Sequence, residues 1–200
     1  MKRIVLIILG IVLLSAAGFG AYTLGTRLGE PEPTAIMGTA FQNPVDVSDV
    51  TLKTAGEKSV SLADYQGKVT LVFFGFTRCP DVCPLTLSRL SKLRDDLAQP
   101  DDLQVVMITV DPEFDTPDIA NAYASGFNPS FVGLSGSNSD IAKVMERFYV
   151  GAAGMGTEQY FHTDVVFVLN RDAQMKYLYS QADMQYLEDN VKTLLKQKNW

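Results

Sequence analysis

The sequence predicts an α/β layer sandwich preceded by one membrane-spanning helix. Apolar runs of strand length alternate with helical patterns, and the last two runs are separated by only a short turn. A long uncharged segment lies near the N-terminus. Strands that alternate with helices, followed by a hairpin and a terminal helix, are typical of a sheet covered by helical layers.

The N-terminal segment Ile4–Thr26 contains 23 residues without a charge, enough to cross a bilayer core that needs about 20. Lys2 and Arg3 precede this segment, so the positive-inside bias places the N-terminus in the cytoplasm. A cleaved signal peptide is the alternative, with Ser15-Ala16-Ala17 near the cleavage site, but signal cores span only about 7–15 residues. We therefore expect a retained anchor at residues 1–27 in the cytoplasmic (inner) membrane. The globular domain then lies on the periplasmic or outer face.

Residues 28–44 are rich in Pro and Gly and show no periodicity, which is typical of a tether. The domain is expected to span residues 45–200. Within it, Val45–Leu52 and Ser59–Leu62 flank a turn and predict a short N-terminal hairpin.

The exported part of the chain is acidic. Without Lys2 and Arg3, 15 of the 17 basic residues remain against 23 acidic ones, a net charge of −8. Nucleic-acid binding needs clustered Lys and Arg that replace counterions, so we expect no nucleic-acid partner.

The remaining elements follow from apolar patterns and capping residues. Buried strands are expected at Val69–Phe76, Leu103–Val110, Phe131–Leu134 and Val165–Leu169, with Met175–Tyr179 as the hairpin partner of the last. Helices are expected after Pro84, after a cap at Asp115 or Thr116 with Pro117 in the first turn, around Ile141–Phe148, and around Met184–Leu195. Ligand chemistry in such folds gathers at the carboxyl ends of strands. An antiparallel Val165–Leu169 strand would bring its preceding residues to that same edge.

Both cysteines, Cys79 and Cys83, lie where the first buried strand turns into a helix. A helix start presents free N–H groups and a partial positive charge, which favour thiolate and lower a cysteine's pKa. This environment suits a nucleophile or a soft-metal ligand.

Three roles compete for this cysteine pair. A purely structural disulfide would close a loop of only five residues, for which chain entropy gives roughly 2 kcal/mol. A redox dithiol is the stronger alternative, but such oxidoreductases usually have two intervening residues, and this chain has Pro80, Asp81 and Val82. Spacing close to one helical turn lets both sulfurs point the same way, as metal chelation requires.

His162, the only histidine, follows a glycine-rich loop. One imidazole added to two thiolates makes a set that favours copper, with thiolates suiting Cu(I) and imidazole also accommodating Cu(II). Structural zinc normally needs four protein ligands, and the chain offers no further Cys or His. Asp111, Glu113 and Asp115 could bind a hard cation, but Asp115 fits a helix cap and Asp111 a turn.

The combination of CPDVCP, VDPEFDTP and a single His before a late strand resembles the Sco/SenC family over roughly residues 40–198. This family comprises membrane-anchored, thioredoxin-fold copper proteins that help assemble the copper A centre of cytochrome c oxidase. The resemblance implies a thioredoxin-like fold with Cys79, Cys83 and His162 as copper ligands and with Asp111 beside the site. It also departs from the family at one point, because the position before the histidine is commonly Asp and is here Phe161. Asp164, two residues after His162, is the other carboxylate that could support it.

The expected function is therefore a membrane-anchored copper metallochaperone binding Cu(I), Cu(II) or both. It would deliver copper to the copper A subunit of cytochrome c oxidase or reduce that subunit's copper-ligand cysteines. Another copper chaperone or a thiol reductase could be a further partner. The alternative is a thiol-disulfide oxidoreductase that acts through Cys79 and Cys83, and a third possibility is an anchored interaction domain.

Overall fold

The computed structural model describes residues 36–97, 100–153, 161–198 and 200. The expected anchor at residues 1–27 lies outside the described residues, as do residues 28–35 of the expected tether. Within the described ranges, no helix combines the length and apolar character that crossing a membrane requires.

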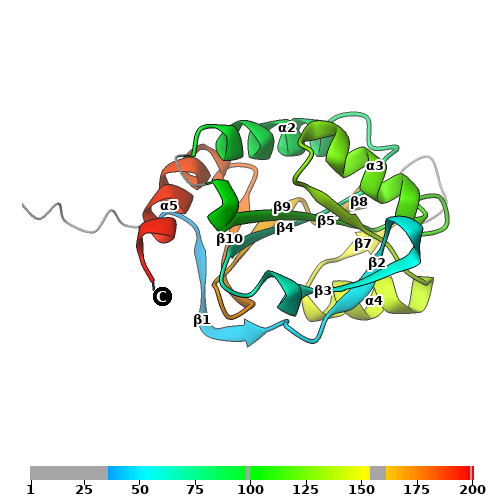
Figure 1. Ribbon diagram of the computed structural model, residues 1–200, viewed down its shortest axis with the longest axis horizontal. Helices are drawn as coiled ribbons and strands as arrows, with labels where there is room; N and C mark the ends of the chain where they lie inside the picture. The colour runs from blue at the N-terminus through cyan, green and yellow to red at the C-terminus, as the bar shows by residue number, and fades with distance from the viewer. Residues whose placement is uncertain (1–35, 98–99, 154–160, 199) are drawn as a thin grey trace, which may run out of the picture. The chain divides into compact units, whose positions relative to one another are not determined.

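A six-stranded mixed sheet forms the centre of the domain, with strand order β1-β10-β9-β4-β5-β6 (Figure 1). Its strands are β1 (Thr39–Asp46), β4 (Val69–Gly75), β5 (Leu103–Thr109), β6 (Val132–Leu134), β9 (Val165–Leu169) and β10 (Gln174–Ser180). Two smaller antiparallel pairs are β2 (Thr51–Thr54) with β3 (Lys58–Ser61), and β7 (Ala152–Ala153) with β8 (Phe161–His162). The first of these pairs is the predicted N-terminal hairpin, but its first strand begins six residues later than expected and its second strand is shifted by one residue.

Helices cover both faces of the sheet. Helices α2 and α3 lie on one side and α4 on the other (Figure 1). The helices are α2 (Val82–Asp95), α3 (Pro117–Phe127), α4 (Asn138–Arg147) and α5 (Met184–Lys196), with short 3-10 turns at Ala55–Glu57, Leu62–Tyr65 and Pro100–Asp102. This arrangement confirms the predicted α/β layers.

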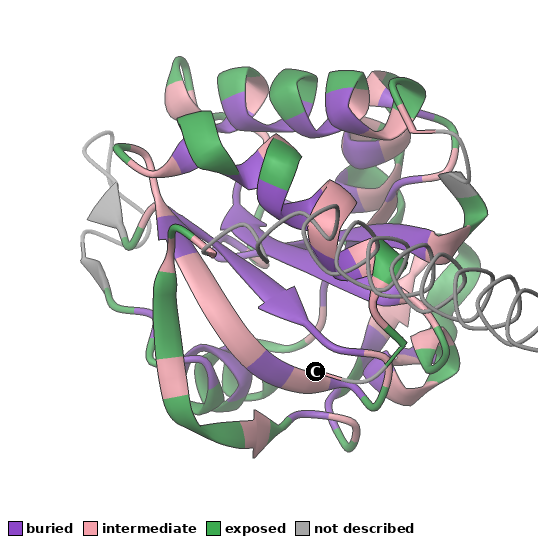
Figure 2. Cartoon of the chain, turned by 90° about the vertical axis from the view of Figure 1, so that its left-hand side faces the viewer, coloured by how far each residue is buried: buried purple, intermediate pink, exposed green. Residues whose placement is uncertain are grey.

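The centre of the sheet, which includes strands β4 and β5, is buried (Figure 2). Every residue of both strands is buried, which explains why each is a continuous apolar run instead of an alternating one. The two strands are parallel and paired in register from Val69 with Leu103 to Gly75 with Thr109. Strand β9 is antiparallel to β4, so its first residue lies at the edge where β4 and β5 end. The sequence predicted this convergence.

The domain begins earlier than the expected boundary at Val45. Residues Thr39–Asp46 form β1, which pairs with β10 through a register shift between Ala40 and Val45. Most β1 residues are exposed because the strand is at the sheet edge, so the sequence there lacks the apolar alternation that would reveal a strand. Gly38 leads into β1 against the ring of Tyr179, where a Cβ atom would lie 2.8 Å from the ring.

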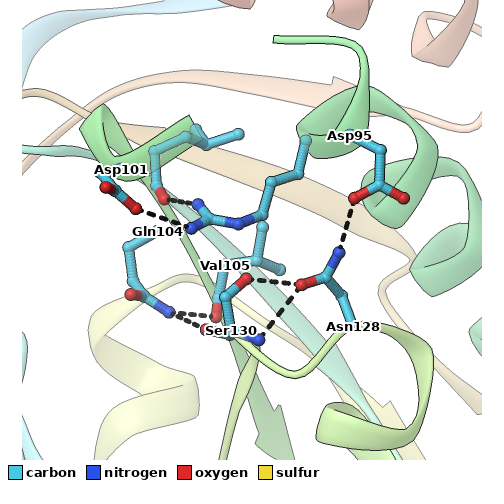
Figure 3. Close-up of polar contacts among 8 residues, drawn as sticks. Asp95, Asp101, Gln104, Val105, Asn128 and Ser130 are labelled. Atoms are coloured by element: carbon cyan, nitrogen blue, oxygen red, sulfur yellow. Dashed lines mark hydrogen bonds and ion pairs between the residues drawn. The ribbon is translucent and has the colours of Figure 1, made fainter. Parts of the chain in front are cut away.

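Side-chain hydrogen bonds fix the C-terminal end of α2 near the start of β5, at the end of the sheet away from the cysteines (Figure 3). Asn128 Nδ2 donates to Asp95 Oδ1 at 3.0 Å, and Asn128 Oδ1 accepts from the amide and hydroxyl of Ser130. Gln104 Nε2 then donates to the carbonyls of Val105 and Ser130, both at 2.9 Å. These bonds connect α2, β5 and the α3–β6 loop, and therefore hold α2 at the end away from the cysteines.

Candidate metal and redox site

The two cysteines lie on the short connection between β4 and α2. Cys79 is half-buried in the turn, and its amide donates to the carbonyl of Phe76 at 3.2 Å. Helix α2 begins at Val82, so Cys83 lies in its first turn with its side chain fully buried. The Cys83 amide points back to Cys79 Sγ at 3.4 Å. Both cysteines are reduced thiols.

A glycine at the end of β4 makes room for the buried thiol. A Cβ atom at Gly75 would lie 3.1 Å from Cys83 Sγ and 2.7 Å from the ring of Phe73. Because the backbone approaches the sulfur this closely, a larger residue at position 75 would displace the ring or the thiol.

Burial, more than the helix dipole, controls the charge state of Cys83. Desolvation raises the pKa of the Cys83 thiol, and a hydrogen bond with the Cys79 thiol and the negative charge of Asp164 raise it further. The prediction that the helix start lowers the cysteine pKa is therefore wrong for Cys83. The physical reason is that the Cys83 amide faces the sulfur of Cys79, while the Cys83 sulfur itself points into the apolar core.

Tyr123 on α3 belongs to the surroundings of the thiols, although no sequence motif indicated it. Burial raises the pKa of Tyr123 to about 12, and the nearby Cys83 and Cys79 add to this effect when they are charged. Its ring packs edge-to-face against Phe127, with ring centroids 5.2 Å apart. The half-buried phenol therefore lies close to both cysteines.

Asp111, at the end of β5, connects the acidic segment to the cysteine turn. Asp111 is 5 % exposed, and its carboxylate pairs with Arg78 Nη2 at 2.5 Å. The Arg78 guanidinium also lies 4.4 Å from the ring centroid of Phe114, a cation–π contact. Asp111 thus contacts the residue next to Cys79, and its supporting role at the site stays a prediction.

Asp115 has a larger role in the structure than the helix cap considered from the sequence. Thr116 is the N-cap of α3, and its side chain accepts from the amide of Ile119. The fully buried Asp115 carboxylate instead accepts from the amide and hydroxyl of Thr77, at 2.9 and 2.5 Å, and from the Thr109 hydroxyl at 2.7 Å. One carboxylate therefore ties the cysteine turn to the end of β5.

The backbone of His162 lies in β8, where it pairs with Ala152. Its side chain is outside the described part of the structure. The following residue, Thr163, is bound to Gly151 by its amide at 2.9 Å and by its hydroxyl, which accepts from the Gly151 amide at 3.0 Å. These bonds fix the chain immediately after His162.

Asp164 lies at the start of β9, close enough to Cys83 for its charge to act on the thiol. Gln181 Nε2 donates to Asp164 Oδ1 and also to Thr86 Oγ1, both at 3.0 Å. Consecutive Cα atoms are about 3.8 Å apart, so the Cα of His162 lies within roughly 8 Å of the Cα of Asp164. The antiparallel strand thus brings the His162 backbone to the sheet edge that holds the thiols.

Among the described side chains, no three His, Cys, Asp or Glu residues lie close enough together to hold a metal ion. The described donors are the two thiols, and the expected third donor belongs to His162, whose side chain is not described. Two thiols in contact, with a histidine-bearing strand nearby, suit a soft metal by their chemistry. They also suit thiol-disulfide exchange.

Comparison with known proteins identifies the family. Residues 42–196 match the family described as SCO1/SenC. The SCO2-like protein of Rickettsia felis is 32 % identical over 175 residues, which cover 84 % of this chain and 85 % of that protein.

Two solved structures agree with the fold. Apo Sco1 from Thermus thermophilus has a TM-score of 0.69 and 38 % identity over 81 % of this chain and 96 % of that one. Bradyrhizobium japonicum ScoI with copper bound has a TM-score of 0.65 and 31 % identity over 78 % of this chain and 99 % of that one. These similarities confirm the predicted thioredoxin-like fold, and the chain belongs to the SCO1/SenC family.

Proposed function

We propose that this protein is a copper metallochaperone in which Cys79, Cys83 and His162 bind the metal. The observation that carries the proposal is the meeting of β4, α2 and β9 at one sheet edge. There the thiols contact each other, and Asp164, two residues after His162, is near enough to act electrostatically on Cys83. A relative at 31 % identity has been solved with copper bound.

The thiol protons control metal binding. Binding requires thiolates, and burial disfavours the thiolate of Cys83 in the metal-free protein. A soft cation between the two sulfurs would supply the positive charge that offsets this burial. Copper loading and a Cys79–Cys83 disulfide exclude each other because they use the same sulfurs, so the redox state of the pair controls loading.

We further propose that the domain is held on the outer face of the cytoplasmic membrane by residues 4–26. Its partner would be the copper A subunit of cytochrome c oxidase, as the resemblance to the Sco/SenC family suggests. The anchor would keep the domain at the membrane that contains the oxidase, so the protein would meet its partner by diffusion along one surface. Another copper chaperone would supply the metal, and a thiol reductase would keep the pair reduced.

The test is titration of the reduced, detergent-solubilised full-length chain with Cu(I) and with Cu(II). We expect one copper per chain, and we expect Cys79→Ser, Cys83→Ser and His162→Ala each to weaken binding strongly. Gln185→Ala, at an exposed position on α5, is the matched control and should bind like wild type. Unchanged stoichiometric binding in His162→Ala and Cys79→Ser would exclude the proposed ligand set.

The alternative function, thiol-disulfide exchange, is favoured by the unequal exposure of the two cysteines. Cys79 is half-buried and Cys83 fully buried, an arrangement that suits an attacking and a resolving thiol. The Cys79 thiolate would attack a partner disulfide and release one partner thiolate, which takes up a proton. Cys83, after losing its proton, would then attack the Cys79 sulfur and release the second partner thiol. The chain ends as a disulfide, and two electrons pass to the partner.

Loss of His162 distinguishes these functions. A dithiol reductase without a metal role retains its rate of disulfide reduction in His162→Ala, whereas a copper chaperone loses copper affinity. Both measurements should be made on the same preparation, with Cys79→Ser as the variant that abolishes disulfide reduction.

A further inference from the structure

We propose that Gln181 is a positioning residue that holds the His162 segment against the helix that carries Cys83. That His162 binds copper rests on the proposed function. The placement of its segment rests on hydrogen bonds. Gln181 lies in the turn between β10 and α5, outside every motif that the sequence indicated.

The amide group of Gln181 bridges two elements that are far apart in sequence. Nε2 carries two hydrogens, and its neighbours within hydrogen-bond distance are Thr86 Oγ1 and Asp164 Oδ1, both at 3.0 Å. The two acceptors are separated from Gln181 by 95 and 17 residues. One side chain therefore fixes the start of β9 relative to α2.

Both acceptors are close to proposed ligands. Thr86 is fully buried on α2, three residues after Cys83 and on the same helical face. Asp164 follows His162 by two residues and acts electrostatically on Cys83. The bridge Thr86–Gln181–Asp164 thus connects the two sides of the site without using a ligand.

A second set of hydrogen bonds holds the His162 segment to a different part of the fold, so the contribution of Gln181 can be measured separately. Thr163 is bound to Gly151 through its amide and its hydroxyl. Those bonds hold β8 to the end of the α4–β7 connection, but they do not connect it to α2. The Gln181 bonds join the segment after His162 to the cysteine-bearing helix.

Removing this bridge should loosen His162 relative to the thiols while leaving the thiols in place. Residues that orient metal ligands typically change affinity by about 10- to 100-fold when they are replaced. We therefore expect Gln181→Ala to weaken Cu(I) binding about 10-fold or more in competition with a chromophoric chelator. Gln181→Glu keeps the length of the side chain, removes both N–H donors and repels Asp164, so it should weaken binding at least as much.

The decisive measurement is a double-mutant cycle with His162→Ala in the full-length chain. If Gln181 acts by positioning His162, Gln181→Ala has no effect on Cu(I) affinity once His162 is absent. An equal loss of affinity in both backgrounds would overturn the proposal, because Gln181 would then act on the thiols or on the fold. Gln185→Ala removes an exposed amide that donates to the Ala182 carbonyl at 3.2 Å, and it should match wild type.

Two further measurements do not depend on copper. Hydrogen exchange of the Thr163 amide should be faster in Gln181→Ala than in wild type, and the reduction potential of the Cys79/Cys83 pair should stay the same. Unchanged exchange at Thr163 would overturn the proposal. If wild type binds no copper, the proposed function fails, while the exchange result still decides whether Gln181 positions the segment.

The bond can also be rebuilt with its polarity reversed. In Gln181→Glu combined with Asp164→Asn, the asparagine amide can donate to the new carboxylate, and the pair again carries one negative charge. We expect this double variant to recover slow exchange at Thr163 relative to Gln181→Glu alone. Failure to recover would contradict a role based on this hydrogen bond.

Discussion

Replacement of Asp115 should release the cysteine turn from the rest of the domain. Its buried carboxylate accepts three hydrogen bonds from Thr77 and Thr109, at 2.5–2.9 Å. Hydrogen bonds to charged groups contribute about 1.5–3 kcal/mol each, and their contributions are not additive because the burial of the charge opposes them. In Asp115→Ala the two hydroxyls can find new orientations, but the Thr77 amide loses its acceptor. We expect the free energy of unfolding to fall by about 3–5 kcal/mol.

For a domain of this size, about 2–4 °C is lost per kcal/mol, so Asp115→Ala should lower Tm by roughly 6–20 °C. Asp115→Asn retains an oxygen for the Thr77 amide and should lose only about 1–3 kcal/mol. Urea denaturation of the reduced protein measures both values. Asp172→Asn makes the same chemical change at an exposed turn between β9 and β10 and should be neutral. Asp115 variants as stable as Asp172→Asn would refute the role assigned to this carboxylate.

Four further substitutions test packing and burial around the sheet. Gly75→Ala places a methyl group against Cys83 Sγ and the Phe73 ring. It should cost about 1–3 kcal/mol of unfolding free energy and shift the reduction potential of the thiol pair, since the buried sulfur must move. Gly133→Ala puts a Cβ atom 2.1 Å from a backbone oxygen of α3 and should destabilise the fold more severely. Gly126→Ala, inside α3, meets no atom within 4 Å and should stabilise the fold by about 0.5–1 kcal/mol. A neutral Gly133→Ala in urea denaturation would contradict this close approach of helix and strand. Burial raises the pKa of Tyr179 to about 12, so the folded protein holds the phenol proton more tightly than the unfolded chain does. The stability that this group contributes is present below pH 10 and is lost as pH rises toward 12. Tyr179→Phe should make the decline of unfolding free energy between pH 10 and 12 shallower, and an unchanged slope would contradict this assignment.

Tyr179→Phe should also cost little stability at neutral pH. The Tyr179 hydroxyl is buried and has no hydrogen-bond partner among the described residues. Asn190 is near enough to favour the charged phenol slightly, but the geometry of the two groups does not form a hydrogen bond. Removing a buried hydroxyl without a partner removes a desolvation cost, so the variant should be neutral or slightly more stable.

The parts of the fold that could be predicted from the sequence are those whose burial produces a local pattern. Strands β4 and β5 are buried on both faces, so their sequences are continuous apolar runs. Helix α3 begins with a Thr cap followed by Pro, and both signals lie within two residues of its start. Strand β1 gave no such pattern because its edge position leaves most of its side chains in solvent.

The cysteines and His162 could be identified as candidates from residue type and spacing, whereas the residues that hold them could not. Asp115 acts on Thr77 from 38 residues away, and its local sequence is equally that of a helix cap. Gln181 reaches Thr86 across 95 residues and has no neighbouring motif. Such contacts depend on tertiary packing, and hydrophobic periodicity carries no information about them. The same limit explains the error at Cys83, since the helix start is a local feature and the burial of the sulfur is not.

The unequal surroundings of the two cysteines follow from these long-range contacts. Asp115 and the Arg78–Asp111 pair hold the turn that carries Cys79, from the end of β5. Cys83 is held by α2, whose far end is fixed by Asn128. The two sulfurs are therefore positioned by different contacts, and a change in the support of one can move it relative to the other. Because chelation and disulfide formation require different separations of the sulfurs, substitution of Asp115 should change the balance between these two states. Substitution of Gln181 should instead weaken chelation through His162 and leave the thiol pair in place.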